Sequence, residues 1–70
     1  MKLCVIGLGL IGGSIAKDLK KTGFATEVAG VETNPEHAKE ALRLGIADRI
    51  ASLEEGVAGA DMVIVATPVD

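Results

Sequence analysis

The sequence predicts an α/β fold, a doubly wound parallel sheet of which these 70 residues supply the first half. Three observations lead to this prediction. Apolar residues run without interruption over 3–6, which is typical of a parallel strand covered on both faces. Further apolar runs at 28–31 and 62–66 follow amphipathic segments, so strands alternate with helices. Right-handed crossovers then place four strands in the spatial order 3-2-1-4, with two to three helices.

The first strand is predicted at Lys2–Ile6, and the first helix runs from about Ile11 to Lys21. Gly23 is expected to end this helix in a left-handed cap, and Phe24 is expected to fold back into the core. Charged side chains occupy the outer face of the helix. Its predicted inner face consists of Ile11, Ile15, Ala16 and Leu19.

The second strand is predicted at Glu27–Val31 and carries a glycine in its interior, Gly30. Such a glycine marks a close approach to the backbone, either by a ligand or by packing neighbours, and the sequence leaves both open. The next helix has a clear start signal, with Asn34 as N-cap and Pro35 at the first helical position. Gly45 is expected to cap its end. Its predicted inner face consists of Ala38, Ala41 and Leu42.

The last third of the chain is predicted to hold two strands and a brief helix. A short third strand is expected around 47–50. Ser52-Leu53-Glu54-Glu55 is a capping-box pattern, which predicts a helix over 53–58. The fourth strand, 62–66, is the most strand-like run in the chain, and Pro68 stops it.

In the order 3-2-1-4 the fourth strand lies at the edge of the sheet. An unpaired apolar edge invites pairing or aggregation. We therefore expect residues 1–70 to be the N-terminal part of a larger domain, or to need a partner along 62–66.

Composition argues against several classes of function. A net charge of −3 without a Lys or Arg cluster argues against nucleic acid as a partner, and one aromatic residue provides no base-stacking platform. The single cysteine and single histidine, Cys4 and His37, cannot make a metal site. We interpret Cys4 as a small buried hydrophobe and His37 as a solvated helix residue.

No apolar run approaches the ~20 residues of a membrane span, so no membrane association is expected. The segment 1–16 does imitate a secretory signal peptide, with Lys2 before an apolar run and Ser14-Ile15-Ala16 at its end. Four glycines in that run and a polar helix face that begins at Lys17 favour a strand, turn and helix instead. A cytoplasmic location is then the default expectation.

The turn after the first strand carries the pattern G-x-G-x-x-G at Gly7, Gly9 and Gly12. Gly7 permits a sharp turn, Gly9 lacks the Cβ that would hold a pyrophosphate away, and Gly12 lets the helix approach the sheet. Phosphates then meet the free N–H groups of about Leu10, Ile11 and Gly12, at the positive end of the helix dipole. We interpret the turn as a dinucleotide-binding site; a purely structural turn is the alternative.

The acid expected about 20 residues after such a turn is Glu32, at the end of the second strand. A carboxylate there accepts the adenosine ribose hydroxyls and repels a 2′-phosphate, by ~4 kcal/mol at about 4 Å and an effective dielectric near 20. We therefore predict NAD rather than NADP, with Thr33 beside Glu32 in the cofactor site. The alternative is a surface carboxylate, with Arg43 or Arg49 folding over a phosphate.

Thr67 and Pro68 follow the fourth strand at the carboxyl edge of the sheet, where ligands sit in folds of this kind. We expect them to form a wall near the nicotinamide ribose. A plain strand terminator is the alternative interpretation.

Several of these segments closely resemble the N-terminal part of prephenate dehydrogenases, and the resemblance covers essentially the whole chain. The matching segments are Val5–Ser14, Gly30-Val31-Glu32, Asn34-Pro35-Glu36 and Ala60–Asp70. The resemblance implies a Rossmann-like segment that binds NAD. The positions that match cofactor-binding positions of the family are Gly7, Gly9, Leu10, Ile11 and Gly12 for the pyrophosphate, Glu32 for the ribose, and Ala66, Thr67 and Pro68 near the nicotinamide ribose.

The resemblance further implies an oxidative decarboxylation in tyrosine biosynthesis, in which prephenate becomes 4-hydroxyphenylpyruvate. This segment cannot separate prephenate from arogenate as the substrate. In the family, the catalytic histidine and a helical domain that binds substrate and forms a homodimer lie beyond the equivalent of Asp70. We therefore expect no catalytic residue in 1–70 and no turnover by this chain alone. Another hydroxyacid-type dehydrogenase and a non-catalytic NAD-sensing module are the alternatives.

Overall fold

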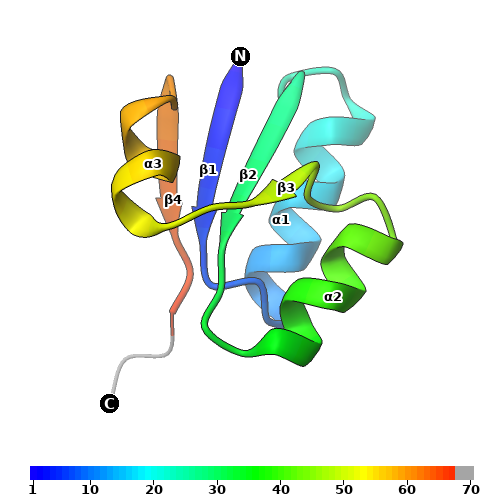
Figure 1. Cartoon of the computed structure of the whole chain (residues 1–70). Coiled ribbons are helices and arrows are strands. Elements are labelled where there is room, and N and C mark those ends of the chain that lie inside the picture. Colours follow the sequence, from blue (N-terminus) through cyan, green and yellow to red (C-terminus); the bar gives the residue numbers. More distant parts are fainter. Residues whose placement is uncertain (68–70) are drawn as a thin grey trace.

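The computed structural model describes residues 1–67, which form one parallel four-stranded sheet with three helices (Figure 1). The strands lie in the order β3-β2-β1-β4, with Leu3 opposite Val28 on one side and Met62 on the other. The predicted half of a doubly wound fold and its strand order are confirmed. The elements are β1 (Lys2–Ile6), α1 (Leu10–Lys21), β2 (Glu27–Val31), α2 (Pro35–Arg43), β3 (Arg49–Ile50), α3 (Leu53–Ala58) and β4 (Met62–Val65).

The main core lies between one face of the sheet and the helices α1 and α2. Alternate residues of β1, Leu3 and Val5, point into it together with Val28 of β2. Small residues face them from the helices, Ala16 in α1 and Ala41 in α2. Because the helices contribute alanines, they lie close to the sheet.

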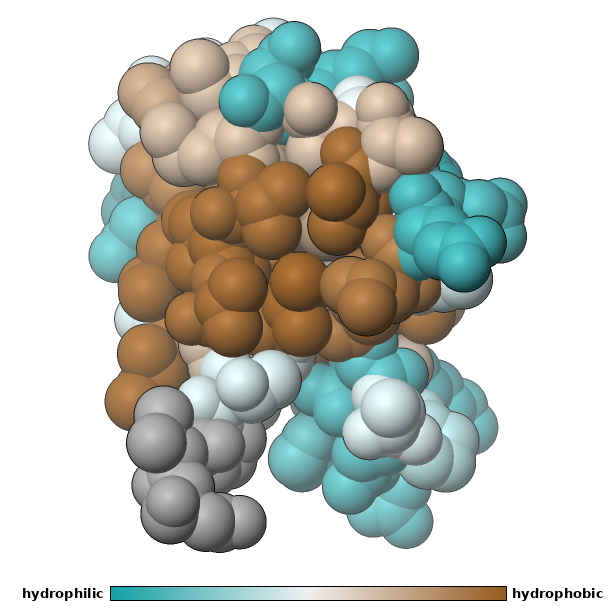
Figure 2. All heavy atoms as spheres, turned by 90° about the vertical axis from the view of Figure 1, so that its left-hand side faces the viewer, coloured by the Kyte–Doolittle hydropathy of each residue, from teal (hydrophilic) through white to brown (hydrophobic). Residues whose placement is uncertain are grey.

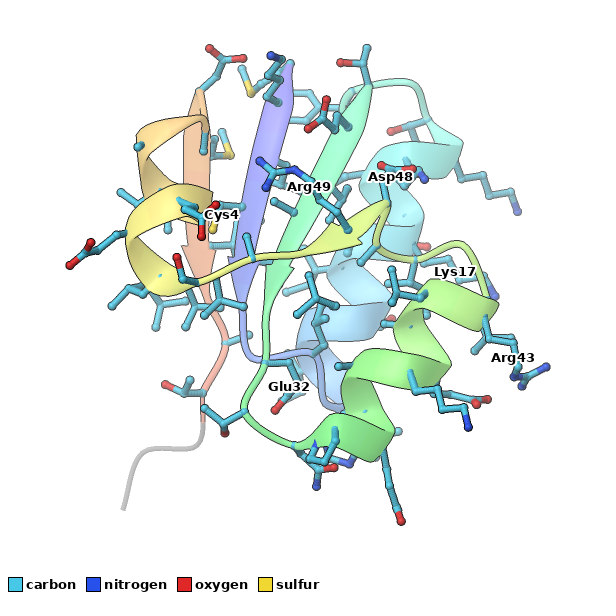
Figure 3. The ribbon with its side chains drawn as sticks, viewed as in Figure 1. Cys4, Lys17, Glu32, Arg43, Asp48 and Arg49 are labelled. Carbon is cyan, nitrogen blue, oxygen red and sulfur yellow. The ribbon has the colours of Figure 1, made fainter. Side chains whose placement is uncertain are left out.

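The helix α3 packs on the opposite face through Gly56. A Cβ at Gly56 would lie 3.0 Å from the sulfur of Cys4 and 3.0 Å from Cγ2 of Val31, so a larger residue would push the helix away from the sheet. Cys4 is a buried free cysteine, as predicted (Figure 3). Burial raises the pKa of its thiol, and the charge of Arg49 opposes this only in part.

Both predicted helix starts with a capping side chain are confirmed. The Asn34 side chain accepts the N–H groups of Glu36 at 2.9 Å and His37 at 3.3 Å. Ser52 accepts the N–H of Glu55 at 3.2 Å and donates its hydroxyl hydrogen to the carboxylate of that residue at 3.0 Å. These bonds satisfy N–H groups that have no partner inside the helix.

The predicted inner face of α1 is wrong at Ile11, whose side chain is 70% exposed. The helix begins at Leu10, and its buried positions are Gly12, Gly13 and Ala16. Because glycines make the contact with the sheet, the first turn leaves no room beneath it for a branched side chain. Ile11 therefore points to the rim of a cleft that is described below.

Phe24 and Leu42 are also exposed, at 43% and 45%, and the prediction that they are core residues is wrong. Gly23 does form the predicted left-handed cap, with φ +82°. The chain then turns so that Ala25 takes the buried place and Phe24 points outward. In α2 the residue that faces the sheet is Ala41, so Leu42 is rotated by about 100° toward solvent.

The third strand is shorter than the predicted 47–50 and consists only of Arg49 and Ile50. Gly45 ends α2 as predicted, with φ +72°. The N–H of Ala47 then bonds back to the helix, at 3.2 Å from the Ala41 carbonyl, so the chain reaches the sheet late.

Gly30 in the interior of β2 provides space for packing. A Cβ there would overlap the side chain of Leu8 and lie 3.3 Å from Cδ1 of Ile50. Of the two interpretations that the sequence leaves open, the approach of packing neighbours is therefore the one that the structure supports.

The strand β4 forms the edge of the sheet, as predicted. Beside α3 it leaves a broad apolar surface, which Figure 2 shows in brown. We call this surface the β4–α3 face; its exposed apolar residues are Leu53, Val57, Met62, Val63 and Val65. Within residues 1–67 no helix has the length and apolar character needed to cross a membrane.

Candidate functional site

The carboxyl ends of β1, β2 and β4 surround a cleft of about 570 Å³. Its walls come from three segments far apart in the sequence: the glycine turn, the start of α2 and the end of β4. The lining residues are Gly7, Gly9, Leu10, Ile11, Glu32, Thr33, Asn34, His37, Ala66 and Thr67. The structure thus brings together the predicted cofactor residues apart from Gly12, which lies beneath the turn, and Pro68, which lies outside the described residues.

Two glycines give the turn its compact shape. Gly7 has φ +94°, and a Cβ there would lie 3.1 Å from the carbonyl carbon and oxygen of Ala66. A Cβ on Gly12 would overlap the carbonyl oxygen of Gly7 and lie 3.1 Å from the Ala66 Cβ. Since main-chain atoms fill both places, neither position accepts a side chain without moving the turn.

Gly9 differs from these two glycines, because a Cβ there would meet no atom within 4 Å. Its missing side chain leaves open space directly at the N-terminus of α1, where Gly9 lines the cleft. Steric packing within the protein therefore does not explain a glycine here, whereas the close approach of a ligand to the backbone does.

The N-terminus of α1 is open, in contrast to the other two helices. Its N-cap, Gly9, provides no capping side chain, and its first turn carries no acidic residue. Both α2 and α3 are capped by a side chain, from Asn34 and Ser52, and both have acids in the first turn. Uncapped N–H groups of a helix N-terminus thus face the cleft only from α1, among the described helices.

Glu32 lines the cleft as well and follows directly after the last residue of β2 (Figure 3). Its carboxylate accepts the N–H of Leu8 at 2.6 Å and that of Asn34 at 3.0 Å, and His37 Nδ1 lies 3.8 Å away. Burial alone raises the pKa of this carboxyl, but the main-chain hydrogen bonds from Asn34 and Leu8, with the nearby His37, outweigh burial and lower it. The group is therefore an anion with further lone pairs for a ligand's hydroxyl groups.

Two lining residues were not predicted as part of the site, Asn34 and His37. The side chain of His37 is 53% exposed, which agrees with a solvated histidine, but it also borders the cleft. The signal that indicates both residues is their position. The first turn of α2 follows β2 directly, so residues three apart on that turn share the edge on which Glu32 lies.

A second hollow, of about 590 Å³, lies between α1 and α2 and shares Gly9, Leu10 and His37 with the cleft. Apolar residues such as Leu44 and Ile46 form most of its lining, and neither Glu32 nor the end of β4 reaches it. Within residues 1–67 no group of three or more His, Cys, Asp or Glu side chains could hold a metal ion. The candidate site is therefore the cleft.

An open helix N-terminus after a glycine turn, facing a carboxylate at the end of the next strand, defines a dinucleotide-binding protein of the doubly wound type. Residues 15–70 match the family model of the prephenate dehydrogenase nucleotide-binding domain. The chain belongs to this family, and the resemblance drawn from its sequence is confirmed.

Known relatives extend the match over the glycine turn. Prephenate dehydrogenase of Bacillus subtilis (strain 168) is 45% identical over 69 residues, which are 97% of this chain and 19% of the relative. The enzyme of the same name from Lactococcus lactis subsp. cremoris is 40% identical over 68 residues, again 97% of this chain and 19% of the relative. The chain thus spans about a fifth of the length of these relatives.

Two solved structures share the fold. Prephenate dehydrogenase from A. aeolicus, in complex with hydroxyphenyl propionate and NAD+, has a TM-score of 0.84 and 33% identity, over 97% of this chain and 24% of that one. Synechocystis arogenate dehydrogenase has a TM-score of 0.84 and 31% identity, with the same shares of both chains.

Proposed function

We propose that this chain binds NAD as the nucleotide-binding part of a prephenate dehydrogenase. The observation that carries the proposal is that Gly9 and Glu32 line one cleft, with the open N-terminus of α1 beside Gly9. Membership of the nucleotide-binding family and the NAD+ complex of the A. aeolicus relative support it.

In this proposal the chain holds the coenzyme by its main chain. The N–H groups of Leu10, Ile11 and Gly12 bind the pyrophosphate, for which Gly9 leaves space. Glu32 accepts the ribose hydroxyls, with Thr33 beside it. Bound NAD supplies the acceptor for a hydride from prephenate, which loses its ring carboxylate as carbon dioxide and yields 4-hydroxyphenylpyruvate.

At the other end of the cleft we assign Ala66 and Thr67 to the nicotinamide ribose. Both line the cleft, and Ala66 continues the pairing of β4 by donating its N–H to the Ile6 carbonyl at 2.8 Å. A wall made of main chain and small side chains leaves room for a flat ring. Pro68, which we propose for the same wall, follows directly in sequence.

The charge around Glu32 supports NAD over NADP. Asn34 already caps the N-terminus of α2, so the amides nearest to a 2′-phosphate are occupied. The two arginines that could fold over a phosphate are engaged elsewhere, Arg43 with Glu40 and Arg49 with Glu27. A 2′-phosphate would therefore meet the Glu32 anion without an arginine to compensate its charge.

The test is the ratio of the dissociation constants of NAD and NADP, measured by titration calorimetry at low and at physiological salt. Repulsion of ~4 kcal/mol corresponds to nearly three decades of affinity before screening, so we expect at least about 100-fold preference for NAD. Equal affinities, or tighter binding of NADP, would contradict the assignment of Glu32.

Arogenate is the second candidate substrate, because the Synechocystis arogenate dehydrogenase matches the fold with the same TM-score as the prephenate enzyme. Steady-state kinetics of the gene product with each substrate separates the two.

We also propose that the catalytic histidine and the dimer-forming helical domain lie outside residues 1–70, and that these residues alone do not reduce NAD with prephenate. Formation of NADH by residues 1–70 with prephenate would refute this.

A further inference from the structure

The carboxylate of Glu32 joins the end of β2 to the glycine turn. One oxygen accepts the N–H of Leu8 at 2.6 Å, and the other accepts that of Asn34 at 3.0 Å. Leu8 stands between the first two glycines, so this bond fixes the main chain immediately before Gly9 opens toward the cleft. The Glu32 side chain is only 10% exposed, and its hydrogen bond from Leu8 is partly buried, whereas the bond from Asn34 is exposed.

The side chain of Leu8 provides a second attachment for the same residue. It is 6% exposed and occupies the space above Gly30, where a Cβ would overlap it. A third attachment is the N–H of Gly7, which donates to the Val31 carbonyl at 2.9 Å. The turn is thus tied to β2 on both sides of the Leu8 Cα, by its amide and by its side chain.

We propose that Glu32 is a positioning residue for the pyrophosphate-binding turn in addition to its role toward the ribose, and that it acts through Leu8 and the space that Gly30 leaves. The inference rests on the proposed function, because it takes the turn to bind a diphosphate. The chemistry permits both roles at once. A carboxylate has about four lone-pair directions, and two main-chain donors leave the others for ribose hydroxyls.

This arrangement couples the ribose position at Glu32 to the turn that binds the pyrophosphate. The free N–H groups of α1 bind a diphosphate only if the turn before them keeps its shape, and Glu32 is the polar side chain that holds Leu8 in that turn. Replacing Glu32 therefore weakens diphosphate binding even when the ligand has no ribose. A residue that only recognised the sugar would have the opposite effect, because removing its negative charge favours an anion nearby.

The experiment compares inorganic pyrophosphate with adenosine diphosphate, using NMR titration of the protein as its gene encodes it. In Glu32→Ala we expect both ligands to bind about tenfold more weakly or worse, since the Leu8 N–H loses a charged acceptor. Glu32→Gln keeps one acceptor oxygen and should fall between that variant and the unchanged protein. In the absence of ligand, hydrogen exchange of the Leu8 amide should speed up in Glu32→Ala.

Glu36→Gln is the matched control, because Glu36 is an exposed acid in the first turn of α2 that does not line the cleft. It removes the same charge four residues away and should leave pyrophosphate affinity unchanged or slightly higher. Gly30→Ala keeps Glu32 but displaces Leu8, and should weaken pyrophosphate binding. If Glu32→Ala fails to fold, Gly30→Ala still tests the positioning role.

The outcomes distinguish failure of the positioning role of Glu32 from failure of the proposed NAD binding. If Glu32→Ala or Gly30→Ala weakens only adenosine diphosphate and leaves pyrophosphate unchanged, the positioning role is refuted and NAD binding stands. If the unchanged protein binds neither ligand, the proposed function fails and the positioning role fails with it. Weaker pyrophosphate binding in Glu32→Ala and Gly30→Ala, but not in Glu36→Gln, supports the proposal.

Discussion

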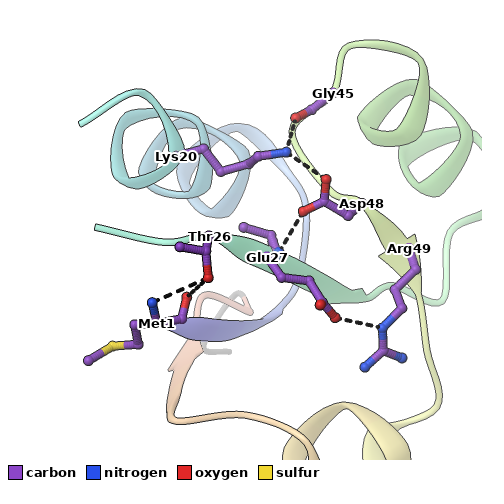
Figure 4. Close-up of polar contacts among 8 residues, drawn as sticks. Met1, Lys20, Thr26, Glu27, Gly45, Asp48 and Arg49 are labelled. Atoms are coloured by element: carbon purple, nitrogen blue, oxygen red, sulfur yellow. Dashed lines mark hydrogen bonds and ion pairs between the residues drawn. The ribbon is translucent and has the colours of Figure 1, made fainter. Parts of the chain in front are cut away.

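Lys20 and Asp48 form an ion pair between α1 and the segment before β3, with the ammonium nitrogen 2.8 Å from the carboxylate (Figure 4). Lys20 also donates to the carbonyl of Gly45 at 3.1 Å, and the second oxygen of Asp48 accepts the N–H of Val28 at 2.7 Å. These bonds connect α1, the end of α2 and β2 at the edge of the sheet away from the cleft. They hold β3 in place, because this short strand forms few backbone hydrogen bonds of its own.

Replacing Asp48 with alanine should therefore destabilise the fold. The change removes a partly exposed ion pair and leaves the Val28 N–H without its acceptor, for which we expect a loss of about 1–2 kcal/mol in the free energy of unfolding. Urea unfolding followed by circular dichroism measures it. Asp18→Ala is the control, because this acid lies on the exposed face of α1; it should change the free energy by less than about 0.5 kcal/mol.

Asp48 should also shape the response of stability to acid. The hydrogen bond from Lys20, together with that from the Val28 N–H, lowers the pKa of Asp48. A carboxyl whose pKa is lower in the folded state stabilises the fold above its unfolded pKa of about 3.9 and loses this contribution as pH falls through the folded value. Below about pH 4, the stability of the unchanged protein should fall more steeply than that of Asp48→Ala. Parallel curves for the two proteins would rule out this contribution.

Gly9→Ala should separate ligand binding from folding. A Cβ at Gly9 meets no protein atom within 4 Å, and its φ of −71° suits any residue, so stability should stay within about 0.5 kcal/mol. The same Cβ enters the space proposed for the pyrophosphate, so NAD affinity should fall by at least about tenfold. Thermal unfolding and calorimetric titration of one preparation test both parts. Unchanged NAD affinity would show that the ligand does not approach the backbone here.

Gly12→Ala should give the opposite pattern and damage the fold itself. Alanine favours a helix by about 1 kcal/mol over glycine, but here its Cβ overlaps the carbonyl oxygen of Gly7. We expect the overlap to prevail, with a net loss of about 1–3 kcal/mol in stability and weaker NAD binding as a consequence. A stability equal to that of Gly9→Ala would contradict the close packing of α1 against the turn.

The β4–α3 face should make residues 1–70 self-associate when they are expressed alone, because β4 is an unpaired apolar edge strand. Val65 is 67% exposed, and Val65→Lys places a charge on this edge, which opposes strand pairing. Sedimentation velocity at protein concentrations from about 10 to about 300 μM should show association, and the lysine variant should show less of it. A stable monomer across that range, with the edge open, would contradict the prediction.

Most of the fold could be predicted from the sequence, because its signals are local. An uninterrupted apolar run before a glycine turn predicts β1, and Asn34 before Pro35 predicts the start of α2 at the residue where it is found. The exposed Phe24 could not be predicted in this way. A left-handed glycine determines that the chain turns, but the packing of α1 and β2 determines whether Phe24 or Ala25 ends up inside.

The site shows the same division between local and non-local information. The pattern of Gly7, Gly9 and Gly12 indicates the turn, yet the contacts that restrict its shape involve Ala66, more than fifty residues later. The hydrogen bond from Leu8 to Glu32 depends on the register of β1 against β2 and has no signature in either segment alone. His37 borders the cleft because of the direction in which α2 leaves the sheet.

Gly56 brings α3 so close to β1 that the sulfur of Cys4 is covered, and this gives the chain a natural reporter of its own dynamics. A thiol-specific reagent reaches that sulfur only when α3 detaches from the sheet or the whole fold opens, so the labelling rate measures how often these openings occur. Since Cys4 is the single cysteine, no dye site has to be engineered. The same strand leads into the glycine turn, so slower labelling in the presence of a nucleotide would record the stabilisation that binding transmits along β1.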